Sequence, residues 1–234
     1  MPNPPSFRYF KTIPEIIQLA VMLYVRFSLS LRNVEDLLHE RGVDVSYESV
    51  RYWWHRFGFQ FANQIKKRRA GGMHSSNWKW HLDEVFVKIN GERHYLWRAV
   101  DHEGEVLESY VTKKRDKKAA LKFMKKAMRR YGSPNEIVID KLRSYSAAAK
   151  VVGCADKQVT GRWANNRAEN SHLPFRRRER AMLRFWRMHS LQKFASIHAS
   201  FHNLFNSQRS LSKRSTFKLN RDAALTEWRS LVTL

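Results

Sequence analysis

Three carboxylates spaced along the chain are the residues best suited to chemistry. Asp83 lies in the segment WHLDEVFVKING, Asp140 in NEIVIDKLRSY and Glu169 in NNRAENSHLPFRRRER. The first two segments are apolar and indicate strands, whereas the third opens an arginine-rich helix. A carboxylate in a buried strand is unfavourable unless a cation compensates it. In a chain of formal net charge +23, the three groups indicate a divalent-metal site that acts on a polyanion, as in enzymes that cut and join DNA.

The chemistry expected of this site is phosphoryl transfer assisted by two Mg²⁺ ions, for which Mn²⁺ is a possible substitute. Magnesium takes oxygen ligands and keeps several waters, so Asp83, Asp140 and Glu169 suffice as protein ligands, with Asp83 bridging. Two ions about 4 Å apart activate the attacking oxygen and stabilise the leaving one. The attacking group is water in strand cleavage and a DNA 3′-hydroxyl in strand transfer, and neither needs a histidine base.

Neighbouring polar residues have simpler interpretations. A lone Asp in a strand is more often an edge or turn residue, so the assignment depends on the three carboxylates together. Glu84 alternates to the face opposite Asp83 and is expected to be solvated. Asp101 begins a turn, where Asp is favoured, and is expected to be structural. His81 shares the face of Asp83, and a contact to phosphate or to a metal-bound water is as plausible as a packing role.

Composition narrows the class of protein. Lysine and arginine total 44 against 21 acidic residues, which favours nucleic acid as the partner. A hydrophobic content of 43% is enough for a packed core. No apolar stretch is long enough to span a bilayer, no secretion leader opens the chain, and no glycine-rich phosphate loop suggests a nucleotide cofactor. We therefore expect a cytoplasmic DNA- or RNA-handling protein with no membrane partner.

The segment 1–65 predicts a helix-turn-helix DNA-binding domain of three short helices. Ser30 and Ser46 are suited to cap the second and third helices, and Gly58 is expected to end the third. The third is the expected recognition helix, and its candidate DNA-binding residues are Ser49, Arg51, Tyr52 and His55. A helical bundle that binds protein is the alternative. The basic segment 66–77 is expected to be a linker.

The segment 78–234 predicts an α/β catalytic domain with a ribonuclease H-like core. Three antiparallel strands over about 80–110 are followed by a helix at Lys117–Tyr131, a parallel strand at Glu136–Asp140, and further helices. Asn90-Gly91 is a strong hairpin signal between the first two strands. In this fold the strand carrying Asp140 lies beside the strand carrying Asp83, so the two carboxylates are expected to converge.

The part of the chain after Glu169 is strongly basic. Arg177, Arg180, Arg184 and Arg187 fall near one helical stripe, which is expected to bind the DNA backbone. A solvated helix face is the alternative. Three aromatic residues are candidates for stacking on unpaired bases, although core packing is expected for at least two of them. They are Trp163, Phe185 and Trp186.

Three long segments resemble the bacterial insertion-sequence transposases of the IS-six family. They are WHLDEVFVKINGERHYLWRAVD, IVIDKLRSYSAAAK and GRWANNRAENSHLPFRRRERAMLRF. The resemblance runs from the helix-turn-helix to about Arg229 and implies a DDE transposase with an integrase-like core. It implies Asp83, Asp140 and Glu169 as the metal-binding triad, with Lys141 beside the second Asp. The interval from Asp140 to Glu169 is shorter than in the best-known members of the family. If that interval excludes Glu169 as the third ligand, Glu179 is its substitute.

The resemblance also implies binding to short terminal inverted repeats and a replicative outcome in which donor and target replicons fuse. Joining two ends needs at least two active sites, so a homodimer or larger assembly is expected. Two other classes of function are open. One is a non-catalytic, sequence-specific DNA-binding regulator or inactive transposase copy. The other is a nuclease acting on RNA–DNA hybrids or junctions.

Overall fold

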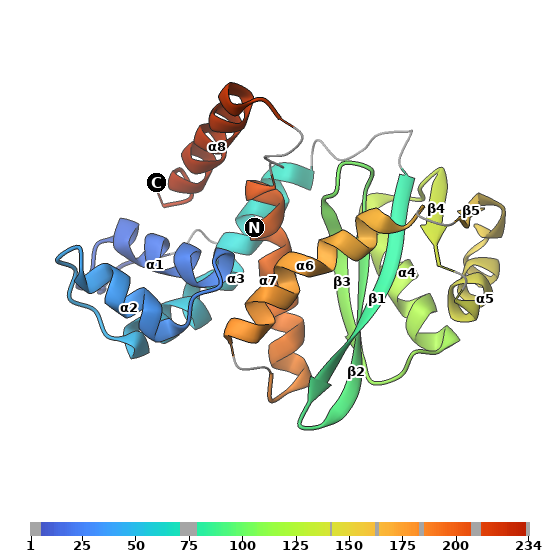
Figure 1. Ribbon diagram of the computed structural model, residues 1–234, viewed down its shortest axis with the longest axis horizontal. Coiled ribbons are helices and arrows are strands. Elements are labelled where there is room, and N and C mark those ends of the chain that lie inside the picture. Colours follow the sequence, from blue (N-terminus) through green and yellow to red (C-terminus); the bar gives the residue numbers. More distant parts are fainter. Residues whose placement is uncertain are drawn as a thin grey trace. The chain divides into compact units, whose positions relative to one another are not determined.

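The computed structural model describes residues 6–70, 79–140, 142–161, 164–182, 185–206 and 212–232. The chain divides into two compact units, whose elements are labelled in Figure 1. One, here called the helical unit, contains Met1–Arg68 and Ser200–Leu234. The other, here called the sheet unit, contains Arg69–Ala199.

The helical unit contains helices from both ends of the chain. They are α1 (Pro14–Arg26), α2 (Leu31–His39), most of α3 (Tyr47–Ala70), the end of α7 (Met188–Phe205) and α8 (Arg214–Arg229). The predicted caps are present. Ser30 Oγ accepts a 3.0 Å hydrogen bond from the Asn33 amide at the start of α2, and Ser46 Oγ accepts one of 3.3 Å from the Ser49 amide in α3.

Helix α3 continues past Gly58, where the sequence predicts its end. An internal glycine costs about 1 kcal/mol relative to alanine. Burial of Phe57, Phe61 and Ile65 on one side of the helix offsets this cost, because all three side chains are fully buried. Residues 66–70 of the predicted linker therefore belong to α3, and its remaining residues, 71–77, lie outside the described part of the chain.

The C-terminal segment packs in the helical unit, whereas the predicted boundaries assign 78–234 to one domain. The Trp228 ring lies 5.1 Å from that of Phe61 and 4.9 Å from that of Phe201, measured between centroids. The Trp228 carbonyl also accepts a 2.6 Å hydrogen bond from the Gln18 side chain. Trp228 thus completes the core formed by α1 and α3. The helical periodicity of the sequence does not predict this contact, because it joins residues far apart in the chain.

The sheet unit is built on a five-stranded sheet in the order β3-β2-β1-β4-β5. The strands are β1 (Lys79–Ile89), β2 (Glu92–Val100), β3 (Val106–Thr112), β4 (Glu136–Ile139) and β5 (Gln158–Val159). The first three pair antiparallel, and β4 and β5 continue the sheet in parallel with β1. This is the ribonuclease H-like arrangement that the sequence predicts.

The predicted hairpin joins β1 to β2. Asn90 and Gly91 both have positive φ, +50° and +82°, and the paired residues on either side are Ile89 and Glu92. Two consecutive positive φ values match a two-residue turn whose twist fits that of the strands. Asparagine and glycine adopt this conformation at low cost, which fixes the register of β1 against β2.

Helices cover both faces of the sheet. On one face, α4 (Lys117–Tyr131) and α5 (Arg143–Val152) bury an apolar core that includes Leu82 of β1 and Trp97 of β2. On the other face, α6 (Asn166–Ala181) contacts β1 and β2. A short 3₁₀ helix, η1 (Ala155–Lys157), precedes β5. Odd-numbered residues around Asp83 therefore face α6, and even-numbered ones face α4 and α5.

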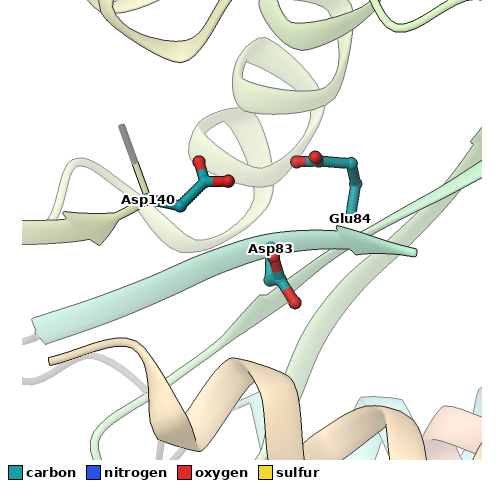
Figure 2. Close-up of side chains that lie close together, drawn as sticks. All are labelled: Asp83, Glu84 and Asp140. Carbon is teal, nitrogen blue, oxygen red and sulfur yellow. The ribbon is translucent and has the colours of Figure 1, made fainter. Parts of the chain in front are cut away.

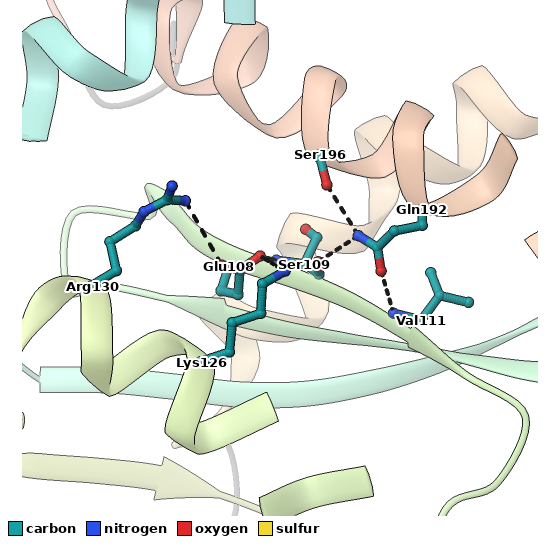
Figure 3. Close-up of polar contacts among 7 residues, drawn as sticks. All are labelled: Glu108, Ser109, Val111, Lys126, Arg130, Gln192 and Ser196. Carbon is teal, nitrogen blue, oxygen red and sulfur yellow. Dashed lines mark hydrogen bonds and ion pairs between the residues drawn. The ribbon is translucent and has the colours of Figure 1, made fainter. Parts of the chain in front are cut away.

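The edge strand β3 is closed by a side chain of α7 (Figure 3). The Gln192 amide accepts a 2.8 Å hydrogen bond from the Val111 N–H and donates one of 2.9 Å to the Ser109 carbonyl. It also bonds to the Ser196 hydroxyl at 3.0 Å. This amide takes the place of a further strand. Since open edges invite pairing with other chains, Gln192 both covers the edge and attaches α7 to the sheet.

Candidate active site

Asp83 and Asp140 meet because β1 and β4 are parallel neighbours. Leu82 pairs with Ile139, so the two aspartates follow at equivalent positions of adjacent strands. With Glu84 they form a group of carboxylates in which one oxygen from each lies within 4.8 Å of the others (Figure 2). The convergence of Asp83 and Asp140 follows from the strand order, which the sequence predicts.

The Glu84 side chain is buried, so the expectation that it is solvated is wrong. Its side chain points to the face opposite Asp83, as alternation predicts (Figure 2), but that face is covered by α4 and α5 and leaves 2% of the side chain exposed. Burial raises the pKa of Glu84 to about 7, with Asp140 and Asp83 adding to the rise and the ion pair with Arg115 opposing it. The Tyr145 hydroxyl is fully buried nearby, and burial, followed by the charge of Glu84, raises its pKa well above the usual value.

Asp140 is half-buried just after the end of β4. Its carboxylate accepts a 3.1 Å hydrogen bond from the Leu142 amide and lies 3.6 Å from a guanidinium nitrogen of Arg115. Burial raises the pKa of Asp140, the Leu142 hydrogen bond opposes the rise, and the charge of Asp83 adds to it. Asp140 is therefore oriented by the backbone of the following turn and remains accessible to solvent.

Asp83 is held from the α6 side by His172. The His172 Nε2 atom lies 3.2 Å from Asp83 Oδ2, and the imidazole is buried. Burial lowers the pKa of His172, although the contact with Asp83 opposes the shift. A neutral imidazole in the tautomer with its proton on Nε2 can donate that proton to Asp83. As placed, Nε2 approaches one carboxylate oxygen closely without the geometry of a hydrogen bond, and nothing in the sequence around His172 indicates this contact.

Arg98 lies directly opposite Asp83 on β2 and is buried on the same face of the sheet. Its guanidinium donates a hydrogen bond to the Ser171 carbonyl, and burial lowers its pKa to about 10. It also lies over the Phe175 ring, 5.4 Å from the centroid. Alternation along β2 places Arg98 on this face. Its burial could not be predicted from the sequence, because arginine side chains are rarely buried.

Glu169 lies in the first turn of α6, with its side chain exposed, outside the group of Asp83, Glu84 and Asp140. The helix is fixed to β1 on both sides of it. The Asn165 side chain donates a 2.8 Å hydrogen bond to the Leu82 carbonyl, and His172 contacts Asp83. Residues 165, 169 and 172 are four and three apart, so they lie on one side of the helix.

Glu179, the substitute third ligand, is engaged elsewhere. Its side chain is buried and forms a 2.6 Å ion pair with Arg176. Glu179 follows His172 by two turns of α6, beyond the part of the helix that is fixed to Asp83 and Leu82. Its neighbour Arg176 also donates a hydrogen bond to the Phe86 carbonyl of β1.

The predicted DNA-binding residues fall into two groups. On α3, Arg51, Tyr52 and His55 are exposed, and Ser49 is half-buried. Farther along the chain, Arg177 and Arg180 are exposed on α6, and Arg187 is exposed just before α7. Because α6 ends at Ala181, the expected single stripe is interrupted and Arg187 does not continue it. Lys141 and Arg184 lie outside the described residues.

The aromatic residues near α6 divide as core and surface. Phe185 is buried and stacks with Phe175 at a centroid distance of 6.3 Å, whereas the Trp186 side chain is 78% exposed. Trp163 lies outside the described residues. Asp101 has the predicted turn role, since its carboxylate accepts hydrogen bonds from the Glu103 and Glu105 amides.

Across the described segments, every helix is too short or too polar to cross a membrane.

Comparison with known proteins gives matches over most of the chain. Residues 77–208 match a family model described as a DDE domain. The transposase for insertion sequence-like element IS431mec of Staphylococcus aureus strain Mu50 is 33% identical over 171 residues, which cover 71% of this chain and 75% of that protein. The transposase for insertion sequence element IS257 in transposon Tn4003 of Staphylococcus aureus shows the same identity and coverage.

Among solved structures, a chain of the simian T-cell lymphotropic virus intasome in complex with the PP2A regulatory subunit B56 gamma is similar at a TM-score of 0.43. The sequence identity is 15%, over 58% of this chain and 51% of that chain.

Proposed function

Because the chain belongs to the IS-six family of DDE transposases, we propose that it binds the terminal inverted repeats of an insertion sequence and transposes it replicatively. As a transposase it acts on DNA, and its DDE domain implies a dependence on divalent metal ions. The proposed reaction cleaves DNA at the repeat ends and joins the resulting 3′-hydroxyls to target DNA. The observation that carries this proposal is the gathering of the Asp83, Glu84 and Asp140 carboxylates in a strongly basic chain.

The donor set of the site fits a hard divalent cation. All the gathered ligand atoms are carboxylate oxygens, which Mg²⁺ and Mn²⁺ prefer over nitrogen or sulfur. We propose two Mg²⁺ ions as the natural cofactor, with Mn²⁺ as a substitute. Such a pair of ions, when bound, activates the attacking oxygen and stabilises the leaving oxygen.

Asp83, Asp140 and Glu169 are the proposed metal-binding residues. Asp83 and Asp140 gather at adjacent strand positions. For Glu169 the support comes from α6, which is attached to β1 through Asn165 and His172, on the same helical side. Its exposed side chain is proposed to turn toward the site when a metal ion binds. Glu84 contacts Arg115 instead and is proposed to support the site from the opposite face.

The chain's own residues hold the site in shape. The buried His172 ring lies against one oxygen of Asp83, and the Leu142 amide orients Asp140. Both carboxylates therefore keep their relative position without an ion, which reduces the ordering cost of binding one.

DNA binding is proposed for two sets of residues. The outward side of α3 would contact the terminal repeats, through Ser49, Arg51, Tyr52 and His55. A second set would bind phosphates near the site, namely Lys141, Arg177, Arg180, Arg184 and Arg187. We further propose that a homodimer or larger assembly brings two ends together, and that the protein works on the nucleoid in the bacterial cytoplasm.

Strand transfer with labelled repeat ends tests this function. The expected result is joined product in Mg²⁺ or Mn²⁺, no product in EDTA, and a loss of at least about a thousandfold in Asp83→Asn with end binding kept. Asp156→Asn, an equivalent change at an exposed position on η1, is the control and should retain activity. End binding without product under any metal would instead identify a regulator or an inactive copy.

A further inference from the structure

Arg115 is a cation placed among the carboxylates of the site. It lies between β3 and α4, and its Nη2 atom forms a close ion pair with Glu84 and lies 3.6 Å from Asp140 Oδ2. One guanidinium nitrogen therefore touches two of the three gathered carboxylates. Neither charge periodicity nor spacing in the sequence points to this residue.

The two contacts of Arg115 differ in strength. Glu84 is almost wholly buried, and its ion pair with Arg115 is the closer of the two. Asp140 is 41% exposed and lies at the longer distance of 3.6 Å. A buried carboxylate depends on its counter-charge, whereas an exposed one can be compensated by water. Arg115 is thus anchored at Glu84 and holds Asp140 loosely.

Three carboxylates this close repel one another unless a cation lies among them. Arg115 provides that charge, because its guanidinium pairs with Glu84 and lies 3.6 Å from Asp140 Oδ2. The third carboxylate, that of Asp83, lies against His172.

We propose that Arg115 is the internal counter-ion of the metal-free site and that it competes with a divalent cation for the Asp140 carboxylate. This inference rests on the proposed function, because it takes Asp140 to be a metal-binding residue. Arg115 remains anchored at Glu84 in both states, and only its contact with Asp140 is exchanged. It acts as a positioning residue that stabilises the site before a metal binds and weakens the affinity for that metal.

Metal binding in the absence of DNA tests the inference independently of catalysis. The probe is Mn²⁺, followed by electron paramagnetic resonance at pH 8, with thermal unfolding in EDTA measured in parallel. Arg115→Met should bind Mn²⁺ about two- to fivefold more tightly, the range expected for losing a partly exposed ion pair. In EDTA the same variant should unfold at a lower temperature than the unmodified protein.

Arg130→Met is the matched control. Arg130 also pairs with a buried glutamate, Glu108, at 3.9 Å, and projects from α4 on the same side of the sheet (Figure 3). Its loss should leave the Mn²⁺ affinity unchanged. Arg115→Met leaves the buried Glu84 carboxylate without its counter-charge and could therefore misfold. Two further variants, Glu84→Gln and the double variant Glu84→Gln with Arg115→Met, avoid this problem because they lack the buried charge. The double variant should bind Mn²⁺ more tightly than Glu84→Gln alone.

Mn²⁺ binding that is not tighter in Arg115→Met than in the unmodified protein, nor tighter in the double variant than in Glu84→Gln, would overturn the competition. The proposed function has a separate readout in the same assay. Unmodified protein whose Mn²⁺ binding is insensitive to Asp83→Asn and Asp140→Asn would contradict the metal site itself. Binding lost in those two variants but unaltered in Arg115→Met would reject only the counter-ion role.

Discussion

Asp83 and Arg98 occupy directly opposed positions of the β1–β2 pair, and both side chains lie on the face covered by α6. Arg98 is buried and donates to the Ser171 carbonyl, while the adjacent His172 contacts Asp83. The same cross-strand pair therefore positions both a proposed metal-binding residue and the helix that carries Glu169. Buried arginine is costly unless its hydrogen bonds and charge interactions compensate, so its presence here indicates a specific positioning role.

Replacing Arg98 should loosen α6 as well as destabilise the fold. We expect Arg98→Met to lower the free energy of unfolding by about 2–4 kcal/mol, because it removes a buried hydrogen bond and the charge opposite Asp83. Urea unfolding and strand transfer measure the two effects. Arg98→Lys should not restore activity, because a lysine has no planar fork with which to reach Ser171. Full activity in the lysine variant would contradict this role.

Asn165 should matter for catalysis more than for stability. Its side chain holds the start of α6 on the Leu82 carbonyl, next to Asp83. Asn165→Ala should lower the free energy of unfolding by only about 1 kcal/mol, the usual net contribution of one hydrogen bond. We expect strand transfer to fall about tenfold or more, since small displacements of reacting groups carry such costs. The exposed neighbour Asn166 is the control, and Asn166→Ala should leave the rate unaltered.

Much of this arrangement could be predicted from local patterns. Alternation placed Asp83 in a strand, and Asn90-Gly91 indicated the hairpin, because both signals depend on residues close in sequence. The meeting of Asp83 with Asp140 needed only the strand order of the ribonuclease H-like fold. Family resemblance then supplied the DDE assignment, which the matches over residues 77–208 and 71% of the chain support.

The remaining features depend on contacts that sequence spacing does not encode. Alternation gave the correct face for Glu84 but not its burial, because α4 and α5 cover that face. Gly58 was expected to end α3, yet tertiary burial of Phe57 and Phe61 carries the helix through it. His172 contacts Asp83 from α6, and Arg115 contacts Glu84 and Asp140 from the loop between β3 and α4. Both are distant in sequence from the residues they contact, so neither could be identified before the fold was known.

Glu84 should give the stability of the metal-free protein a distinctive dependence on pH. Its folded pKa, about 7, lies above its ordinary value of 4.5. Its favourable contribution is therefore complete below pH 4.5 and is lost as pH rises through about 7. Glu84→Gln cannot ionise, so in EDTA it should be more stable than the unmodified protein at pH 8, by on the order of 2 kcal/mol, and little different at pH 4.5.

Urea unfolding at the two pH values measures this difference. Glu103→Gln, at an exposed position in the turn after β2, is the control and should show no such pH-dependent gain. A Glu84→Gln variant that is destabilised equally at both pH values would show that the carboxylate is ionised and well compensated throughout.

Gln192 should protect the edge of the sheet. Gln192→Leu removes the amide that pairs with Val111 and Ser109, leaving both backbone groups without that partner. We expect a loss of about 1–3 kcal/mol in unfolding free energy and faster hydrogen exchange at the Val111 amide. Ser190→Ala, on an exposed part of α7, should change neither quantity. Unaltered Val111 exchange in Gln192→Leu would mean that other contacts close the edge.

The central claim is that Asp83, Asp140 and Glu169 bind the catalytic metal ions together. The most direct test replaces Mg²⁺ with Fe²⁺ in the presence of repeat-end DNA. Added hydrogen peroxide then generates hydroxyl radicals at the bound Fe²⁺, and these cut the polypeptide close to the metal site. The account predicts cuts near residues 83, 140 and 169 that Mg²⁺ suppresses and that Asp83→Asn abolishes. Cuts near 83 and 140 without any near 169 would contradict it and would favour Glu84 as the third carboxylate.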